Sequence, residues 1–146
     1  MRKFAFATRL GVSKRTHNDS FILIPNLQQK SALHFFAVCE GHGVNGSQAQ
    51  NFVKIKMAEY MQGCDLEVDP YKELTLAYQT THLQMLKSSD YKLSGTTCCS
   101  LLLNGRHLII ANAGNSRALV VSDNAMSRQL TIDLTIVDLE ERKRIV

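Results

Sequence analysis

Three turn signals, spaced about ten residues apart, constrain how the second half of the chain can fold. Asn104-Gly105 is a strong hairpin signal, because a type I′ turn needs a positive φ at both of its central residues. Gly114-Asn115 and Asp123-Asn124 follow it, and the segments between these turns are rich in apolar and β-branched residues. The pattern predicts an antiparallel meander with strands over residues 96–103, 106–113, 116–121 and 127–132.

The first half of the chain carries shorter strand patterns. Apolar segments bounded by Pro25-Asn26 and by glycines predict strands over residues 4–9, 21–24 and 33–39. A glycine-rich turn is expected over 41–46. These strands precede any helical pattern, so the chain opens with a small β-rich region.

Two helices are expected between the two β-rich regions. Apolar residues recur at helical spacing after Ser47, which is a possible cap, and Gly63 ends that pattern. Asp69 as N-cap and Pro70 at the first helical position predict a second helix. A short charged helix is expected over 138–146. Strands, helices and strands grouped in this order indicate an α+β fold, and no linker or repeat divides the single domain 1–146.

Composition excludes several functional classes. The net charge of +4 comes from scattered basic residues, and a nucleic-acid-binding surface usually concentrates them, so no nucleic-acid partner is expected. No apolar run approaches the roughly 20 residues of a membrane span. The four cysteines show no Cys-x-x-Cys spacing and no signal peptide is apparent, which predicts reduced thiols and an intracellular, cytoplasmic location.

The segment around Glu40-Gly41-His42 carries the clearest chemical pattern. A carboxylate at a strand end beside glycines suits a hard cation, because glycine lets backbone carbonyls approach the ion. His42 is a group that can transfer a proton near neutral pH. Taken alone, a glycine-rich segment between a strand and a helix is more often only a turn.

Further motifs stand in a fixed order around this segment. They are Lys14-Arg15-Thr16-His17-Asn18-Asp19-Ser20-Phe21, Ser94-Gly95-Thr96-Thr97, Ala111-Asn112-Ala113-Gly114-Asn115-Ser116-Arg117-Ala118 and Leu130-Thr131-Ile132-Asp133, with Glu141, Arg144 and Ile145 behind them. In this order and spacing they resemble the metal-dependent protein Ser/Thr phosphatases of type 2C. The resemblance covers about the first half of that family's catalytic domain. It therefore implies a partial antiparallel β-sandwich flanked by helices and truncated after about half the domain.

The resemblance also implies roles for individual residues. The family uses two Mg²⁺ or Mn²⁺ ions, bridged by an aspartate and a water, to hydrolyse phosphoserine and phosphothreonine. Here Glu40 stands at the bridging position, followed by Gly41, and His42 matches the proton donor. Asp19 matches the acid of the first motif, and Asp133 matches an aspartate linked to a third metal ion. Lys14, with Arg15 beside it, stands at the phosphate-binding position.

Several of these positions depart from the family pattern. Glu40 has one methylene more than aspartate, which matters for the strict geometry of Mg²⁺. Asn18 and Asn115 are neutral where the family has acids, Leu134 replaces a histidine, and two further metal-binding aspartates belong to the family's second half. Lys14 lacks the bidentate guanidinium of arginine. These departures predict degenerate metal and catalytic positions with no cofactor, or Mg²⁺ or Mn²⁺ if any metal is retained.

The interpretation is a pseudophosphatase: an inactive type 2C phosphatase-like protein that acts as a structural or interaction subunit. An active Mg²⁺/Mn²⁺-dependent protein Ser/Thr phosphatase is the alternative, if the missing half is supplied elsewhere. A third reading is a decoy that binds phosphoproteins through Lys14, Arg15 and Arg117. Protein partners are expected in a larger assembly, a cytoskeletal one included, where they would cover open sheet edges such as 21–24 or 33–38.

Overall fold

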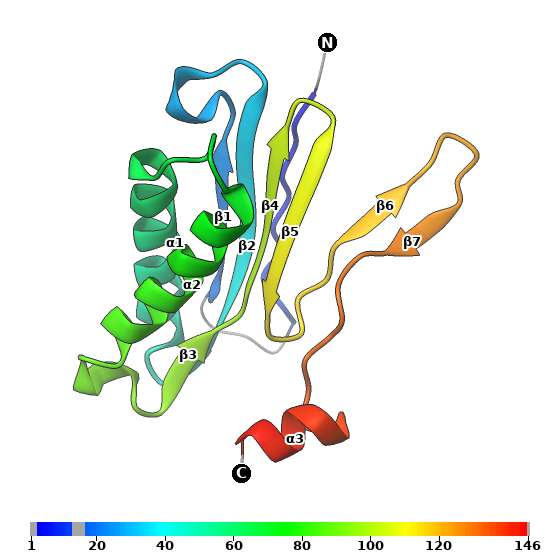
Figure 1. Ribbon diagram of the computed structural model, residues 1–146. Helices are drawn as coiled ribbons and strands as arrows, with labels where there is room; N and C mark the ends of the chain where they lie inside the picture. The colour runs from blue at the N-terminus through cyan, green and yellow to red at the C-terminus, as the bar shows by residue number, and fades with distance from the viewer. Residues whose placement is uncertain (1–2, 13–16, 146) are drawn as a thin grey trace.

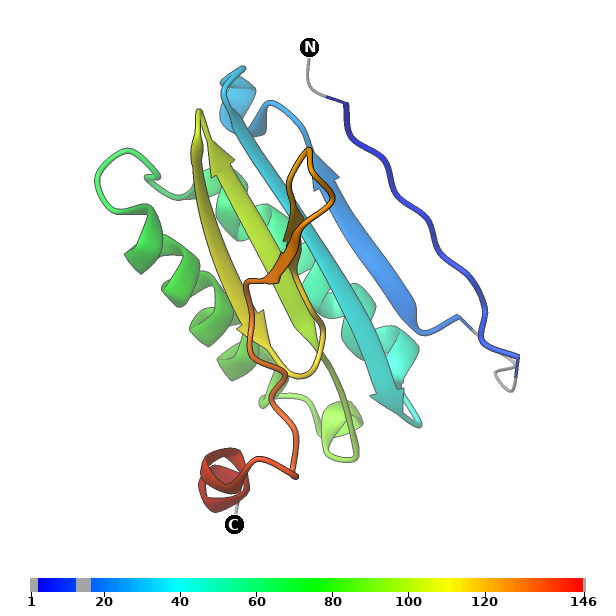
Figure 2. The same ribbon diagram turned by 90° about the vertical axis from the view of Figure 1, so that its right-hand side faces the viewer.

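The computed structural model describes residues 3–12 and 17–145. Two helices cover one face of an antiparallel sheet, and a separate hairpin lies on the opposite side (Figures 1 and 2). The elements are β1 (Asp19–Ile24), a 3₁₀ turn (Leu27–Gln29), β2 (Leu33–Gly43), α1 (Gly46–Gly63), α2 (Pro70–Met85), a second 3₁₀ turn (Ser89–Tyr91), β3 (Ser94–Thr96), β4 (Cys98–Asn104), β5 (His107–Ala113), β6 (Leu119–Val121), β7 (Ser127–Gln129) and α3 (Leu139–Ile145). The α+β class is therefore as the sequence predicts.

The main sheet has five strands. Its order is β1-β2-β4-β5, and β3 pairs with the far end of β2. Every pairing is antiparallel. β2 is a central strand with neighbours on both sides, so the expectation that residues 33–38 form an open edge is wrong. β1 has only β2 as a strand neighbour in the described part of the chain, which leaves 21–24 at an edge.

The predicted meander is split in two. β4 and β5 form the expected hairpin, but Asn104 pairs with His107, so the central turn residues are Gly105 and Arg106. Only Gly105 has a positive φ, of 60°. Glycine at the first central position is the requirement of a type II′ turn, so the predicted type I′ turn is wrong by one residue. β6 and β7 pair only with each other and form their own two-stranded sheet.

Local signals explain most of the helix boundaries. α2 begins as predicted, with Pro70 in its first turn and the Asp69 carboxylate accepting a hydrogen bond from the Lys72 N–H at 2.9 Å. α1 ends at Gly63, as predicted, but its N-cap is Asn45, two residues before the predicted cap Ser47. Residues 41–43, expected in a turn, extend β2 instead and pair with β3. The strand predicted over 4–9 is not present in the described residues, which follow an irregular path there.

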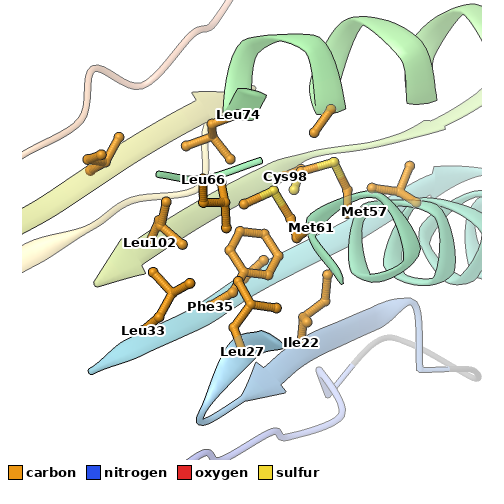
Figure 3. Close-up of a cluster of buried hydrophobic side chains, with 14 of the residues drawn as sticks. Ile22, Leu27, Leu33, Phe35, Met57, Met61, Leu66, Leu74, Cys98 and Leu102 are labelled. Atoms are coloured by element: carbon orange, nitrogen blue, oxygen red, sulfur yellow. The ribbon is translucent and has the colours of Figure 1, made fainter. Parts of the chain in front are cut away.

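The core lies between the sheet and the two helices (Figure 3). Phe35 of β2 is fully buried at its centre, and Met57 and Met61 of α1 pack over it. Alternate residues of β2 from Leu33 to Cys39 face this core, because side chains alternate between the faces of a strand. The opposite set, which includes Val38 and Glu40, faces away from the helices. Glu40, the carboxylate expected at the bridging position, is therefore on the open face of the sheet.

Candidate functional site

Two carboxylates lie opposite each other where β1 and β2 pair. Asp19 is the register partner of Glu40, and both residues are exposed. Directly opposed residues on antiparallel strands have Cβ atoms about 4.5–5.5 Å apart on the same face. Both residues line a cavity of about 360 Å³ and a smaller one of about 190 Å³ beside it. Two adjacent negative charges repel each other, so this pair favours a bound cation or a basic partner.

Basic side chains lie in the same cavities. Arg9 lines both of them, and His17 lines the smaller one. The Thr8 hydroxyl is 3.4 Å from His17 Nε2. Arg9 was not predicted from the sequence, because it lies outside the ordered motifs and only the irregular path of the N-terminal segment brings it to the site. Lys14 and Arg15, the predicted phosphate-binding residues, lie outside the described residues.

The backbones of two glycines, Gly41 and Gly46, pack closely against each other just after Glu40. A Cβ atom on Gly41 would stand 2.0 Å from the carbonyl oxygen of Gly46, the first residue of α1. The Gly41 N–H donates to the Asn18 carbonyl oxygen at 2.7 Å. The end of β2 is thus pressed against both the start of α1 and the residue before Asp19. This close approach requires glycine, and it fixes the backbone that carries Glu40 and His42.

His42 lies apart from the two carboxylates. Its ring packs against Gly95 of β3, where an added Cβ would be 2.9 Å from Nε2. It lines a third cavity, of about 370 Å³, together with apolar side chains of α1 and α2 such as Met57 and Met85. Neither carboxylate is among the residues that line this cavity. The structure therefore separates the predicted proton donor from the cavities that Glu40 shares with Asp19.

The remaining motifs form a hydrogen-bonded framework next to the carboxylate pair, and one of them also supplies Ser116 to the wall of the larger cavity. Thr97 is its centre: its N–H donates to the Glu40 carbonyl at 2.9 Å, and its hydroxyl accepts from the Glu40 N–H at 3.1 Å. The same hydroxyl lies 2.7 Å from Ser116 Oγ. Asn112 then donates to the carbonyl oxygens of Gly114 and Ile132, each at 3.0 Å. The framework links β2 to the segment between β5 and β6 and to the residues after β7.

Asp133 is engaged elsewhere in this framework. It forms an ion pair with Arg117, whose Nε donates to Asp133 Oδ1 at 3.2 Å. The hydrogen bond from Arg117 is the main cause that lowers the pKa of the Asp133 carboxyl. Asp133 is not among the residues that line the cavities of Asp19 and Glu40. The structure therefore does not bring the three predicted metal-side carboxylates together, and the phosphate-binding role suggested for Arg117 would need this pair to open.

Free thiols lie on both faces of the sheet. Cys39 and Cys98 are buried on the side facing the helices, and the hydrogen bond between them is the main cause that raises the pKa of Cys39 and lowers that of Cys98. Burial raises the pKa of Cys64 to about 11 and also raises the pKa of Cys99. The sequence predicts reduced thiols, and the structure adds that two of them are in contact.

The carboxylate pair offers oxygen donors, which are the type of ligand that a single hard cation prefers. Asp19 and Glu40 supply carboxylates, and the Gly41 carbonyl is the third donor predicted from the sequence. Within residues 3–12 and 17–145, no group of three or more His, Cys, Asp or Glu side chains is placed to hold a metal ion. The donor set of the described chain therefore does not fit a pair of divalent ions, which needs several shared carboxylates.

None of the helices described is both long enough and apolar enough to cross a membrane.

Comparison with known proteins identifies the family. The family described as "Protein phosphatase 2C" matches residues 6–146. The chain belongs to the protein phosphatase 2C family. Two curated relatives are "Probable protein phosphatase 2C 35" of Arabidopsis thaliana, 33% identical over 136 residues, and "Protein phosphatase 1L" of Bos taurus, 31% identical over 144 residues. Each match covers 90% of this chain and 39% of the relative.

Solved structures agree with this assignment at the level of the fold. A bacterial serine phosphatase bearing the R161E mutation is 25% identical with a TM-score of 0.72, and the match covers 86% of this chain and 59% of that one. The serine/threonine phosphatase Stp1 of Staphylococcus aureus is 24% identical with a TM-score of 0.75, over 90% and 53% of the two chains. The chain thus spans about two fifths of the curated relatives' length and somewhat over half of these solved domains. Protein phosphatase 2C enzymes use Mg²⁺ or Mn²⁺, as the sequence motifs imply.

Proposed function

We propose that the 146-residue chain is a pseudophosphatase, which has the protein phosphatase 2C fold but does not hydrolyse phosphoesters by itself. The observation that carries the proposal is the carboxylate count at the site. Asp19 and Glu40 are the acidic side chains lining the two cavities on the open face, and Asp133 is paired with Arg117. Asn18 and Asn115 add no charge where the motifs of the family have acids.

Charge balance supports this proposal. Two divalent cations carry four positive charges, and the described site offers two carboxylates to offset them. A bound pair of ions would supply an activated water as nucleophile and would stabilise the phosphoryl oxygens. The chain's own residues would bind and orient the substrate: Arg9 and His17 stand beside the carboxylates and suit a phosphate. A site that binds phosphate next to an incompletely coordinated cation is expected to bind phosphoproteins without cleaving them.

The alternative is an Mg²⁺- or Mn²⁺-dependent protein Ser/Thr phosphatase completed by a further polypeptide segment. The backbone framework around the site favours this alternative. Thr97 makes hydrogen bonds with both the N–H and the carbonyl oxygen of Glu40, and the backbone of Gly41 packs against that of Gly46. The names of the curated relatives, which describe longer proteins, point in the same direction. Under this alternative, the residues described here would form one wall of the site.

Protein partners belong to the same proposal. The face of the sheet away from the helices is apolar, with Phe36, Leu101 and Leu103 in a groove that Phe4 and Phe6 of the N-terminal segment cover in part. We expect a partner protein to cover the remainder of this face, and the isolated chain to self-associate. Sedimentation velocity at micromolar concentration tests this expectation. A monomer that stays soluble across the concentration range would contradict it.

Phosphatase assays on three proteins test the proposal. The wild-type chain, Glu40→Ala and Glu40→Asp are each incubated with p-nitrophenyl phosphate and a phosphothreonine peptide in millimolar Mn²⁺. We expect no turnover above the Glu40→Ala level in either of the other two proteins, because one shortened side chain does not add the absent ligands. Far-UV circular dichroism confirms that all three are folded. Turnover by the wild-type chain that is lost in Glu40→Ala would support the phosphatase alternative.

A further inference from the structure

Cys39 and Cys98 stand opposite each other on the two central strands of the main sheet. The register of β2 pairs Val38 with Cys99 and, further along, Gly41 with Thr96 of β3. Between these pairs, the Thr97 N–H donates to the Glu40 carbonyl oxygen at 2.9 Å. The regular ladder is interrupted here, because the Glu40 N–H donates to the Thr97 hydroxyl rather than to its carbonyl oxygen. The pairs on both sides of the interruption share one register, which places Cys39 level with Cys98.

The two cysteines lie between two points at which their strands are joined. Thr97 holds Glu40 on one side of the two cysteines, and Val38 pairs with Cys99 on the other, so the strands stay adjacent here, and level residues of adjacent antiparallel strands have Cα atoms about 4.5–5.5 Å apart. A disulfide accepts Cα separations of about 4.4–6.8 Å. Both side chains point to the helix side of the sheet, where Cys39 is 2% and Cys98 is 4% exposed. The backbone therefore already has a spacing that a disulfide can bridge.

A cavity gives small molecules a route to Cys98. Cys98 is part of the wall of the cavity of about 370 Å³ that also contains His42. Exposed residues of the same wall, such as His82 and Leu86, open the cavity to solvent. Figure 3 shows Cys98 beside Met57 and Met61, which limits the space around it to a small reagent. Cys99, the next residue, lines the groove on the opposite face instead.

We propose that Cys39 and Cys98 form a redox-active dithiol whose substrate is a small peroxide such as hydrogen peroxide. The sulfur of Cys98 attacks one peroxide oxygen, the O–O bond breaks, and Cys98 becomes a sulfenic acid as one water leaves. The sulfur of Cys39 then attacks the sulfenic sulfur, an S–S bond forms, and the hydroxyl leaves as a second water. Two thiols are oxidised by two electrons, and one peroxide is reduced to two waters.

The position of the pair gives its oxidation a structural consequence. Cys39 directly precedes Glu40, and Cys98 directly follows Thr97, which holds Glu40 through two hydrogen bonds. A disulfide between them closes a loop of chain that contains α1 and α2. Because such a loop restricts the unfolded chain, the oxidised protein should unfold at a higher urea concentration than the reduced one.

The test uses the wild-type chain, so it does not depend on a core substitution folding. The reduced protein is treated with hydrogen peroxide, denatured and alkylated, and its peptides are mapped by mass spectrometry. We expect the four free thiols to fall to two, with one cross-link between the peptides of Cys39 and Cys98, fully reversed by dithiothreitol. Four unchanged thiols, a cross-link between other cysteines, or a sulfinic acid on Cys98 without a cross-link would each overturn the proposal.

Matched variants locate the reaction within the pair. Cys39→Ser should retain a sulfenic acid on Cys98 that dimedone traps, whereas Cys98→Ser should give neither the trapped acid nor the cross-link. Cys99→Ser and Cys64→Ser are controls that should form the cross-link as the wild type does. Loss of the cross-link in Cys99→Ser, with circular dichroism unchanged, would move the reactive site to the other face of the sheet and contradict the proposal.

Discussion

Substitution of Gly41 by alanine should destabilise the chain more than alanine at any other described glycine that does not have a positive φ. The new Cβ would stand 2.0 Å from the carbonyl oxygen and 2.5 Å from the carbonyl carbon of Gly46, and both contacts are with backbone atoms. The start of α1 cannot retreat easily, because the preceding Asn45 donates to Ser94 Oγ at 2.8 Å and to the Asp90 carbonyl at 2.7 Å. The strain must therefore be taken up by β2.

The expected loss follows from two contributions. Forcing an extra carbon into a packed region costs roughly 1–3 kcal/mol. Displacing β2 also weakens the 2.7 Å hydrogen bond from the Gly41 N–H to Asn18, which is worth about 1 kcal/mol. The free energy of unfolding should therefore fall by about 3 kcal/mol. At a urea dependence of about 2 kcal/mol per molar, the unfolding midpoint should fall by about 1.5 M.

Urea titration followed by far-UV circular dichroism measures this loss, with Gly63→Ala as the matched control. Gly63 is the last residue of α1, and an added Cβ meets nothing within 4 Å. Alanine favours helix over glycine by up to about 1 kcal/mol, so the control should be unchanged or slightly more stable. If the free energy of unfolding of Gly41→Ala were within about 0.5 kcal/mol of the wild-type value, the close contact between Gly41 and Gly46 would be refuted.

Three further changes probe the framework. Tyr78→Phe should lower the free energy of unfolding by about 1–3 kcal/mol in the same assay, because the hydroxyl contacts the carbonyl oxygens of Cys98 and Ala111 and the Ser100 hydroxyl within 3.1 Å; no change would contradict these contacts. Asp69→Ala should lower the free energy of unfolding by about 1 kcal/mol through loss of the α2 N-cap. A larger decrease, with loss of helical circular dichroism signal, would show that Asp69 does more than cap this helix. NMR titration should show the pKa of Asp133 below its ordinary value of 3.8, and in Arg117→Ala the pKa should return toward that value. The ion pair then adds to the free energy of unfolding above pH 3.8, and this addition is lost as the pH falls through the lowered pKa.

Local signals in the sequence were sufficient wherever one residue type decides the backbone. Asp69 and Pro70 define the start of α2, and Gly63 ends α1, as predicted. The hairpin at Asn104-Gly105 exists, but the turn is centred one residue later, because strand pairing aligned Asn104 with His107. A turn dipeptide predicts that a hairpin forms, whereas its register also depends on how the two strands pack against the core.

Longer-range features could not be predicted in the same way. The split between β5 and β6 follows from contacts that reach across the fold, such as Asn112 to Ile132, and the strand pattern alone does not contain them. The ordered motifs give Asp19 and Glu40 metal-side roles but do not show that the two residues are paired across β1 and β2. They also give no indication of Arg9, which an irregular segment brings to the cavity. They also group Asp133 with the metal-side acids, although it pairs with Arg117.

The central claim is that the site of this chain has too few carboxylates to hold a pair of divalent ions. Electron paramagnetic resonance of the purified chain with two equivalents of Mn²⁺ tests it directly. We predict only the signal of isolated Mn²⁺ ions, with any bound fraction lost in Glu40→Ala. A spin-coupled signal from two neighbouring Mn²⁺ ions, abolished by the same substitution, would contradict the account.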